Sequence, residues 1–343
     1  MHPATVAVSA NARGDSVTDR RSFLRALAYA VISAPPIARA QAQTVVRRMG
    51  YLKPGAPDSP EETQRESAFL RKLGWIEGEN LRVERRYANG TLELLRPLAE
   101  DLLRLKVELI VTSGTAATLA AKSATNTIPI VFWSAGDPVR TGLVASLARP
   151  GGNITGYSVA QTEMNVKRLA VLREWLPRVH RVGILQNSAN PYFRATREEL
   201  DRGCRTLGIQ PIFVEVAGPG ELTKAVSEVA RRGGRGLLIG SDSLFQDNQK
   251  ELMRAVLKYA LPSTTSRVHI RETGALVSYD PIDSEEMERG ASFVDRILRG
   301  AKPADLPVEQ PTRFELAINL KTANALRITV PPALLARAHE VIE

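Results

Sequence analysis

The sequence has only one cysteine, Cys204, among its 343 residues. A single cysteine excludes a disulfide within the chain, and its position far from the N-terminal region excludes a lipid-anchored N-terminal cysteine. The four histidines are scattered, and no cysteine or histidine pair has the spacing of metal ligands. We therefore expect neither a metal nor another cofactor.

Motifs of the common catalytic sites are also missing. The sequence contains no Gly-x-Ser-x-Gly nucleophile turn, no Gly-x-x-x-x-Gly-Lys phosphate loop and no His-Glu-x-x-His zinc motif. The segment SGTAATLA (113–120) lacks the glycine spacing of a dinucleotide site. Asp137 and Asp242 could form a carboxylate pair, but no feature makes one of them an acid and the other a base. The sequence therefore does not favour an enzyme.

The positive charge of the chain is not clustered. The formal net charge is +9, and removal of residues 1–42, with five Arg and two Asp, leaves +6. Basic residues occur singly or in pairs such as Arg85-Arg86, and no DNA-reading segment precedes the first expected strand. We interpret the charge as a solvated surface and expect no nucleic-acid partner.

Residues 1–42 have the three parts of a secretory signal peptide. A positive segment containing Arg20 and Arg21 precedes about a dozen apolar residues, and a small-x-small site follows, so we expect cleavage near Ala40 or Ala42. Spanning a bilayer takes roughly 20 apolar residues, which argues against a transmembrane helix. The adjacent arginines followed by Ser-Phe-Leu resemble the twin-arginine export signal, although a general secretory signal remains an alternative.

Beyond this leader, apolar strand-like runs alternate with amphipathic helical patterns. VVRRMGYL (45–52), VELIVTSG (107–114), HRVGILQN (180–187) and RGLLIGSD (235–242) are among the expected strands. Strands that alternate with helices of this length predict an α/β fold with two doubly wound parallel-sheet lobes. The glycine-rich segment RPGGNITGYS (149–158) lies between two runs of these units and predicts a hinge. Ser59 and Glu62 predict a capping box at the start of the first helix.

Polar groups follow almost every expected strand. Ligands of doubly wound sheets bind beyond the carboxyl ends of the strands, so the residues that end each strand are the candidates. A plain structural core does not need polar groups at these positions. We expect a small-molecule ligand to contact Thr112, Ser113, Gly114, Thr115, Trp133, Asp137, Asn187, Asn190, Ser241, Asp242 and Tyr279.

Among these candidates, Ser113 and Thr115 follow a buried strand and open a helix. Two hydroxyls, a glycine and free N–H groups at a helix N-terminus form a site for a carboxylate. The alternative is that Thr112 or Ser113 only caps the helix. Asp242 or Asp137 would then meet an ammonium group of the ligand.

Two aromatic residues are also candidates. Trp133 and Tyr279 could stack on an apolar or aromatic part of the ligand. For Trp133, packing in the core beneath the cleft is an equally good interpretation.

Two segments, 128–156 and 274–343, resemble the ABC transporter substrate-binding protein family related to tryptophan- and tyrosine-binding proteins. The resemblance rests on the motifs Asp-Pro-Val, Pro-Gly-Gly-Asn-x-Thr-Gly and Ile-Leu-x-Gly-x-x-Pro-x-x-Leu-Pro, and it covers nearly all of residues 46–343. Two features depart from the family pattern: Ala275 replaces the usual second glycine of Glu-x-Gly-Gly-Leu, and the lipobox cysteine of many relatives is absent.

The resemblance implies a type I periplasmic-binding-protein fold, with two lobes, three hinge crossings and a ligand in the cleft. Residues 45–155 and about 280–305 would form the N-terminal lobe. Residues 156–279 and about 306–343 would form the C-terminal lobe and the return through the hinge.

Together, leader and resemblance predict a soluble periplasmic protein that binds a carboxylate-bearing ligand, an amino acid or an aromatic acid. Hinge closure would enclose the ligand, and an inner-membrane ABC permease would receive it. We expect a monomer. The alternative is a periplasmic sensing domain that passes the same kind of ligand to a receptor, which adjacent permease or histidine-kinase genes would distinguish.

Replacing both Arg20 and Arg21 with lysine is expected to block export while leaving folding intact, because the twin-arginine route requires the arginine pair. Cell fractionation of the double variant measures this. Mature, cleaved protein in the periplasm would instead assign the leader to the general secretory route.

Overall fold

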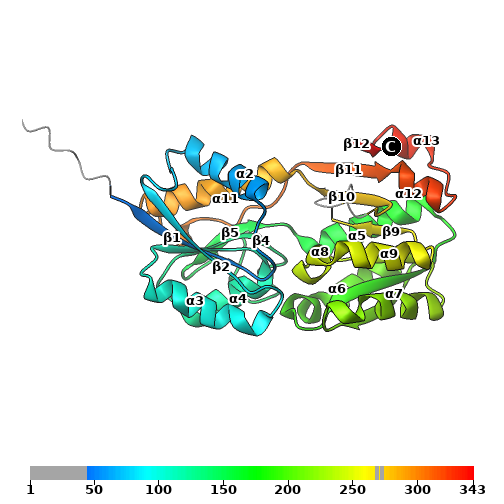
Figure 1. The fold of residues 1–343 in the computed structure, drawn as a ribbon, viewed down its shortest axis with the longest axis horizontal. Helices are drawn as coiled ribbons and strands as arrows, with labels where there is room; N and C mark the ends of the chain where they lie inside the picture. The colour runs from blue at the N-terminus through cyan, green and yellow to red at the C-terminus, as the bar shows by residue number, and fades with distance from the viewer. Residues whose placement is uncertain (1–44, 267–269, 271–273) are drawn as a thin grey trace, which may run out of the picture. The chain divides into compact units, whose positions relative to one another are not determined.

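The computed structural model describes residues 45–266, 270 and 274–343 (Figure 1). The predicted signal peptide, residues 1–42, lies outside the described residues. The described chain forms two β-sheets with helices on both faces of each, so the expected α/β class is confirmed.

Five parallel strands form the first sheet, in the order β2-β1-β3-β4-β5. They are β1 (Arg47–Lys53), β2 (Leu81–Tyr87), β3 (Leu109–Thr112), β4 (Ile130–Ala135) and β5 (Ile154–Ser158). The helices around this sheet are α2 (Pro60–Lys72), α3 (Leu95–Arg104), α4 (Gly114–Ala124) and α11 (Asp283–Leu298), and η1 (Leu92–Leu94) leads into α3. The predicted capping box is confirmed, because Ser59 and Glu62 exchange bonds at the start of α2.

The helices cover the first sheet as two pairs (Figure 1). Successive strand residues point to opposite faces of a sheet, and in a parallel sheet both faces are buried. Ile110 and Phe132 pack with α3 and α4 on one face. Leu109 and Trp133 pack with α2 and α11 on the other. Helix α11 comes late in the sequence, yet it covers one face of a sheet whose strands all come from the N-terminal part of the chain.

Seven strands form the second sheet, in the order β12-β11-β10-β9-β8-β6-β7. They are β6 (Arg181–Asn187), β7 (Gln210–Val216), β8 (Gly236–Ile239), β9 (Ser263–Thr265), β10 (Val277–Pro281), β11 (Phe314–Asn319) and β12 (Glu340–Ile342). The strands are parallel except that β10 and β11 pair in opposite directions. The strand pattern of the sequence predicts parallel sheets, and this antiparallel pair departs from that prediction.

Helices also cover both faces of the second sheet. They are α5 (Gln161–Trp175), α6 (Pro191–Thr206), α7 (Leu222–Arg231), α8 (Ser243–Asp247), α9 (Gln249–Lys258), α12 (Leu320–Ala325) and α13 (Pro332–Leu335), with η2 (Pro219–Glu221) before α7. Leu169 of α5 and Leu200 of α6 share a core cluster with Ile184 of β6. The side chains of α7 and α9 pack in another cluster with β7 and β8.

The chain passes between the two sheets three times. It leaves β5 and enters α5 through Val159 and Ala160, and it leaves β10 and enters α11 at Ile282. After η4 (Pro303–Asp305) it returns through residues 306–313 to β11. Most of the expected hinge segment 149–158 is strand β5 and the turn before it, so the passage itself lies just after this segment. The lobe boundaries given above stay a prediction.

Helix α8 is separate from α9. Asp242 caps the start of α8 through the N–H of Leu244, and the backbone of Asn248 leaves the helical region between the two helices. Among the described residues, no helix is both long and apolar enough to cross a membrane.

Gly156 shows why the strand β5 requires a glycine. Its φ is +151°, a conformation that side-chain-bearing residues rarely adopt, and an added Cβ would lie 2.0 Å from the carbonyl oxygen of Phe132. The neighbouring strand β4 has a register shift between Phe132 and Ala135 at the same place. The close approach of the two backbones therefore depends on the missing side chain.

Gly156→Ala is expected to lower the free energy of unfolding by about 3 kcal/mol, because the clash is with backbone that cannot move away cheaply. Denaturant unfolding measures this change. Gly220→Ala is the control, since an added Cβ there has open space and φ is not in the left-handed region. Equal stability of the Gly156 variant and the wild type would contradict this explanation.

Candidate ligand-binding site

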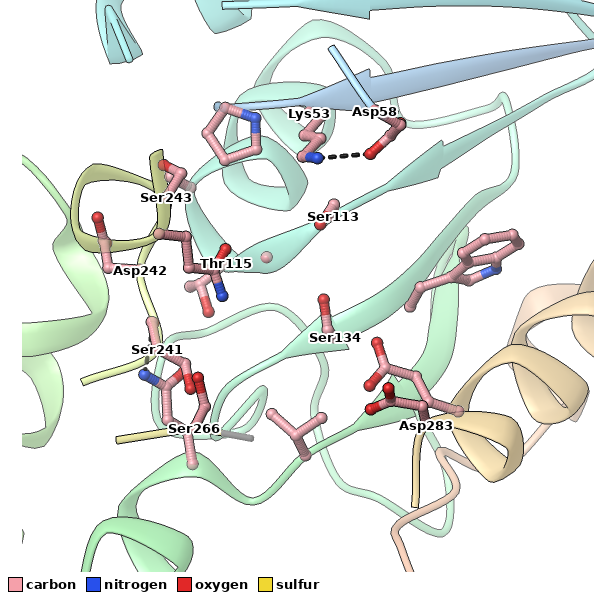
Figure 2. A pocket seen from close by; sticks show the side chains of 18 of the residues that line it. Lys53, Asp58, Ser113, Thr115, Ser134, Ser241, Asp242, Ser243, Ser266 and Asp283 are labelled. Carbon is pink, nitrogen blue, oxygen red and sulfur yellow. Dashed lines mark hydrogen bonds and ion pairs between the residues drawn. The ribbon is translucent and has the colours of Figure 1, made fainter. Parts of the chain in front are cut away.

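A pocket of about 360 Å³ lies where strands of both sheets end (Figure 2). Carboxyl-terminal strand ends are the usual place for ligand sites in α/β sheets, and this volume suits a small molecule. Lys53 is the last residue of β1, Ser134 is the last but one of β4, and Ser241 follows β8. Of the predicted site residues, those that line the pocket are Ser113, Gly114, Thr115, Trp133, Asn190, Ser241 and Asp242.

The turn from β3 into α4 brings Ser113 and Thr115 to the pocket. Ser113 occupies the N-cap position of α4, but its hydroxyl makes no capping hydrogen bond. Gly114 has φ +79°, which turns the backbone between strand and helix. The Ser113 hydroxyl and the first N–H groups of α4 therefore line the pocket wall without a capping bond between them.

Thr112 and Thr115 have partners in the protein. The Thr115 hydroxyl accepts a hydrogen bond of 3.1 Å from the N–H of Gly136, and the side chain is buried. The Thr112 hydroxyl lies 2.8 Å from that of Thr118 and is also buried, and Thr112 does not line the pocket. These two hydroxyls tie α4 and the end of β4 into place, which leaves Ser113 as the hydroxyl best placed for a ligand.

Asp242 is buried within a cluster of amide groups. One carboxylate oxygen accepts from Asn187 and from the N–H of Leu244, both at 2.9 Å, and the other accepts from Asn190 at 2.7 Å. Burial raises the pKa of Asp242, and the hydrogen bonds from the amides oppose that rise. Asn187 does not line the pocket. The cluster joins the loops after β6 and β8. Contact between Asp242 and an ammonium group of the ligand stays a prediction.

Asp137 and Tyr279 lie outside the pocket lining. One Asp137 oxygen accepts from both the hydroxyl and the N–H of Thr162, at 2.6 and 3.1 Å, so this carboxylate holds the start of α5. The Tyr279 ring stacks on Phe314, with ring centroids 5.8 Å apart, on strands β10 and β11. The structure does not bring these two side chains together with the other candidates.

Trp133 combines the two interpretations that the sequence left open. Its side chain belongs to the core cluster between the first sheet and α11, and it also lines the pocket. Its ring meets that of Tyr51 edge to face, with centroids 6.2 Å apart. An added Cβ on Gly290 of α11 would lie 2.6 Å from its indole nitrogen, so the indole lies directly against that helix.

Ionisable residues that the strand-end argument missed also line the pocket. They are Lys53, Asp58, Glu62, Glu66, Arg168, Asp247, Asp280, Asp283 and Glu286. Asp280 ends β10 and Asp283 follows it, so the strand-end rule could have found both. Glu66 and Glu286 lie inside helices, and no local pattern marks them as pocket residues.

Arg168 is a buried cation beside the pocket. Its guanidinium pairs with the Asp280 carboxylate, and it also donates to the Asn165 side chain at 2.7 Å and to the carbonyl of Tyr279 at 3.1 Å. These bonds join α5 to the end of β10. Its donors are therefore largely occupied by the protein.

The pocket wall carries more acids than bases. Eight Asp or Glu residues line it, against Lys53 and Arg168. Lys53 pairs with Asp58 (Figure 2). Among the described residues, no group of three or more His, Cys, Asp or Glu side chains could hold a metal ion.

Known proteins share this fold. The tyrosine-binding protein of Clostridioides difficile (strain R20291) is 23% identical over 274 residues, which are 78% of this chain and 78% of that protein. A conserved domain protein of Vibrio cholerae is 25% identical with a TM-score of 0.81, covering 86% of this chain and 99% of that one. The ABC domain from Streptococcus pneumonia in complex with L-Trp is 22% identical, with a TM-score of 0.79, and the match covers 87% of this chain and all of that one.

These similarities confirm the type I periplasmic-binding-protein fold expected from the sequence. Residues 67–342 also match the family described as ABC transporter substrate binding protein, which is a family of binding proteins and not of enzymes. This match spans most of the described chain and begins after strand β1. The chain therefore belongs to the ABC transporter substrate-binding protein family.

Proposed function

We propose that this protein captures a small carboxylate-bearing molecule, an amino acid or an aromatic acid, and delivers it to an inner-membrane ABC permease. The leader would export it to the periplasm, where it would act as a soluble monomer. The observation that carries the proposal is the uncapped N-terminus of α4, whose Ser113 hydroxyl lines the pocket. The tyrosine-binding and L-Trp-bound relatives support an aromatic amino acid as the first ligand to test.

The N-terminus of α4 is suited to a carboxylate for two reasons. The first N–H groups of a helix have no partner within the helix, and the helix dipole places partial positive charge there. Gly114 leaves space beside these groups, since an added Cβ would meet nothing within 4 Å. A ligand carboxylate would accept hydrogen bonds from these N–H groups and from Ser113.

Loops of the two sheets meet directly at the pocket, which supports enclosure of the ligand. The N–H of Ala56, after β1, donates to the Asp247 carboxylate of α8 at 2.9 Å. Within the second sheet's own elements, the Gln161 amide at the start of α5 donates to the carbonyl of Ser241 at 2.9 Å. We infer that opening would break the contact between Ala56 and Asp247, and that a bound ligand would favour the closed state.

Ser113→Ala is expected to weaken binding of L-tryptophan or L-tyrosine about tenfold, because a hydrogen bond to a charged group contributes about 1.5–3 kcal/mol. Isothermal titration calorimetry measures the Kd. The melting temperature of the unliganded protein should not change, because this hydroxyl caps nothing. Ser123→Ala, at the exposed other end of α4, is the matched control. Wild-type affinity in the Ser113 variant would place the carboxylate elsewhere.

Asp247→Ala is expected to weaken the same ligands about tenfold, since it removes the acceptor that joins α8 to the loop after β1. Small-angle scattering should give a larger radius of gyration for the variant than for the wild type at saturating ligand. Glu251→Ala, an exposed acid on α9, is the control. An unchanged radius of gyration on adding a tight ligand to the wild type would indicate a rigid pocket.

A further inference from the structure

Three acids of the pocket have no salt-bridge partner among the described residues. Glu66 of α2, together with Asp283 and Glu286 of α11, makes no hydrogen bond or ion pair with any residue that the structure describes. Helices α2 and α11 pack against each other, so these carboxylates approach the pocket from adjoining elements. Figure 2 shows Asp283 in the pocket wall, on the side away from Asp242.

The bases near these acids already have acidic partners. Lys53 pairs with Asp58, and Arg85 pairs through two bonds with Glu77, at 2.6 and 2.8 Å. Arg168 forms an ion pair with Asp280. The other ionisable groups that influence Glu66 or Glu286 are acids, namely Asp58, Glu62, Asp280 and Asp283.

Burial is the main cause of raised pKa values for two of these acids, Glu66 and Glu286. Burial, with a further contribution from Asp58, raises the pKa of Glu66 to about 7. Burial, with further contributions from the nearby Asp283, Asp280 and Glu66, raises the pKa of Glu286 to about 8. A cation placed among these carboxylates would favour their ionised form.

An aromatic wall with an unsatisfied donor borders the same acids. Tyr51 and Trp133 line the pocket and are 5% and 6% exposed. The buried indole nitrogen of Trp133 has no hydrogen-bond partner among the described residues. Gly290, against which this indole lies, is four residues after Glu286, so the carboxylate and the indole share one face of α11. Burial raises the pKa of Tyr51, and the charges of Glu66, Asp58 and Glu286 contribute to that rise, which places the Tyr51 ring close to these acids.

Aromatic faces and carboxylates together are the groups that attract organic cations. Cation–π attraction strengthens when the site is desolvated, and a paired carboxylate no longer carries an uncompensated buried charge. A neutral apolar ligand would use the aromatic wall alone and would leave the three acids uncompensated.

We propose that this end of the pocket, formed by Glu66, Asp283, Glu286, Tyr51 and Trp133, binds a positively charged ammonium group of the ligand. The inference rests on the proposed function and narrows its ligand class to amine-bearing carboxylic acids. It assigns the ammonium to residues of α2 and α11 and not to Asp242, whose two oxygens accept hydrogen bonds from protein donors, or to Asp137, which lies outside the pocket lining.

Calorimetric titration with three indole compounds tests the ammonium separately from the carboxylate. L-tryptophan carries both groups, tryptamine lacks the carboxylate, and indole-3-propionate lacks the ammonium. Glu286→Gln and Glu66→Gln should each weaken L-tryptophan and tryptamine at least about tenfold and change indole-3-propionate less than about twofold. Glu288→Gln, an exposed acid of α11 outside the pocket, should match the wild type.

The unliganded variants report on folding. Because the folded-state pKa of Glu286 lies above its usual value, its ionised form destabilises the folded protein once the pH exceeds that usual value. Glu286→Gln should therefore melt at an equal or higher temperature than the wild type at pH 8. Weaker binding of the ammonium compounds then comes from the missing carboxylate charge and not from misfolding.

The pH dependence gives a second measurement on the wild type. Between pH 8 and pH 6 the affinity for L-tryptophan should fall at least about tenfold, because protonation of Glu286 and Glu66 removes the charge that meets the ammonium. Indole-3-propionate should not weaken over this range. Titration at pH 7.5 in buffers of different ionisation enthalpy should show proton release on binding of L-tryptophan, and Glu286→Gln should reduce it.

Several results would overturn the ammonium subsite. Wild-type affinity for L-tryptophan in both Gln variants would do so, as would equal affinity of the wild type for L-tryptophan and indole-3-propionate. Failure of both amine compounds to bind would also overturn it. The proposed carboxylate site fails by other results, namely unchanged binding in Ser113→Ala or tryptamine binding as tightly as L-tryptophan.

Discussion

The buried pair between Arg168 and Asp280 holds together the helix with which the chain enters the second lobe and the strand with which it leaves that lobe. Arg168 belongs to α5, which begins just after the first passage, and Asp280 ends β10, just before the second. Breaking such a buried pair leaves an uncompensated charge and is strongly destabilising. The third passage is joined to the second, because the Thr312 hydroxyl donates to Glu285 of α11 at 2.8 Å. The relative placement of the strand ends that form the pocket depends on these bonds.

The return of α11 to the first sheet gives the pocket its chemistry. This helix packs on β4 and against α2, although more than a hundred residues separate it from either element in the sequence. It brings Glu286 towards Glu66 and the indole of Trp133. The pocket therefore contains the N-terminus of α4, which suits an anion. It also contains acids of α2 and α11 that have no salt-bridge partner among the described residues. A molecule with one positive and one negative group matches both features.

Polar groups at the other strand ends serve mainly to fix the loops. Asp242, Asn187 and Asn190 satisfy one another, and Asp137 satisfies the start of α5. Buried polar groups that are fully hydrogen-bonded rigidify a site, whereas those without partners are free to recognise a ligand. In this pocket the partly exposed hydroxyl of Ser113 and carboxylates of Glu66 and Glu286 have no hydrogen-bond partner among the described residues and are free to recognise a ligand.

The sequence by itself determined the α/β class, the capping box at Ser59 and the position of Ser113 at the start of a pocket helix, because strand alternation and helix caps are local patterns. The sequence also predicted that ligands bind at the carboxyl ends of strands, and the pocket residues Asp280 and Asp283 lie at such an end. Only the tertiary structure decided that Asp137 and Tyr279 lie outside the pocket and that Glu66 and Glu286 line it. A helical glutamate looks like a solvated residue in sequence, and its burial depends on which distant helix packs beside it.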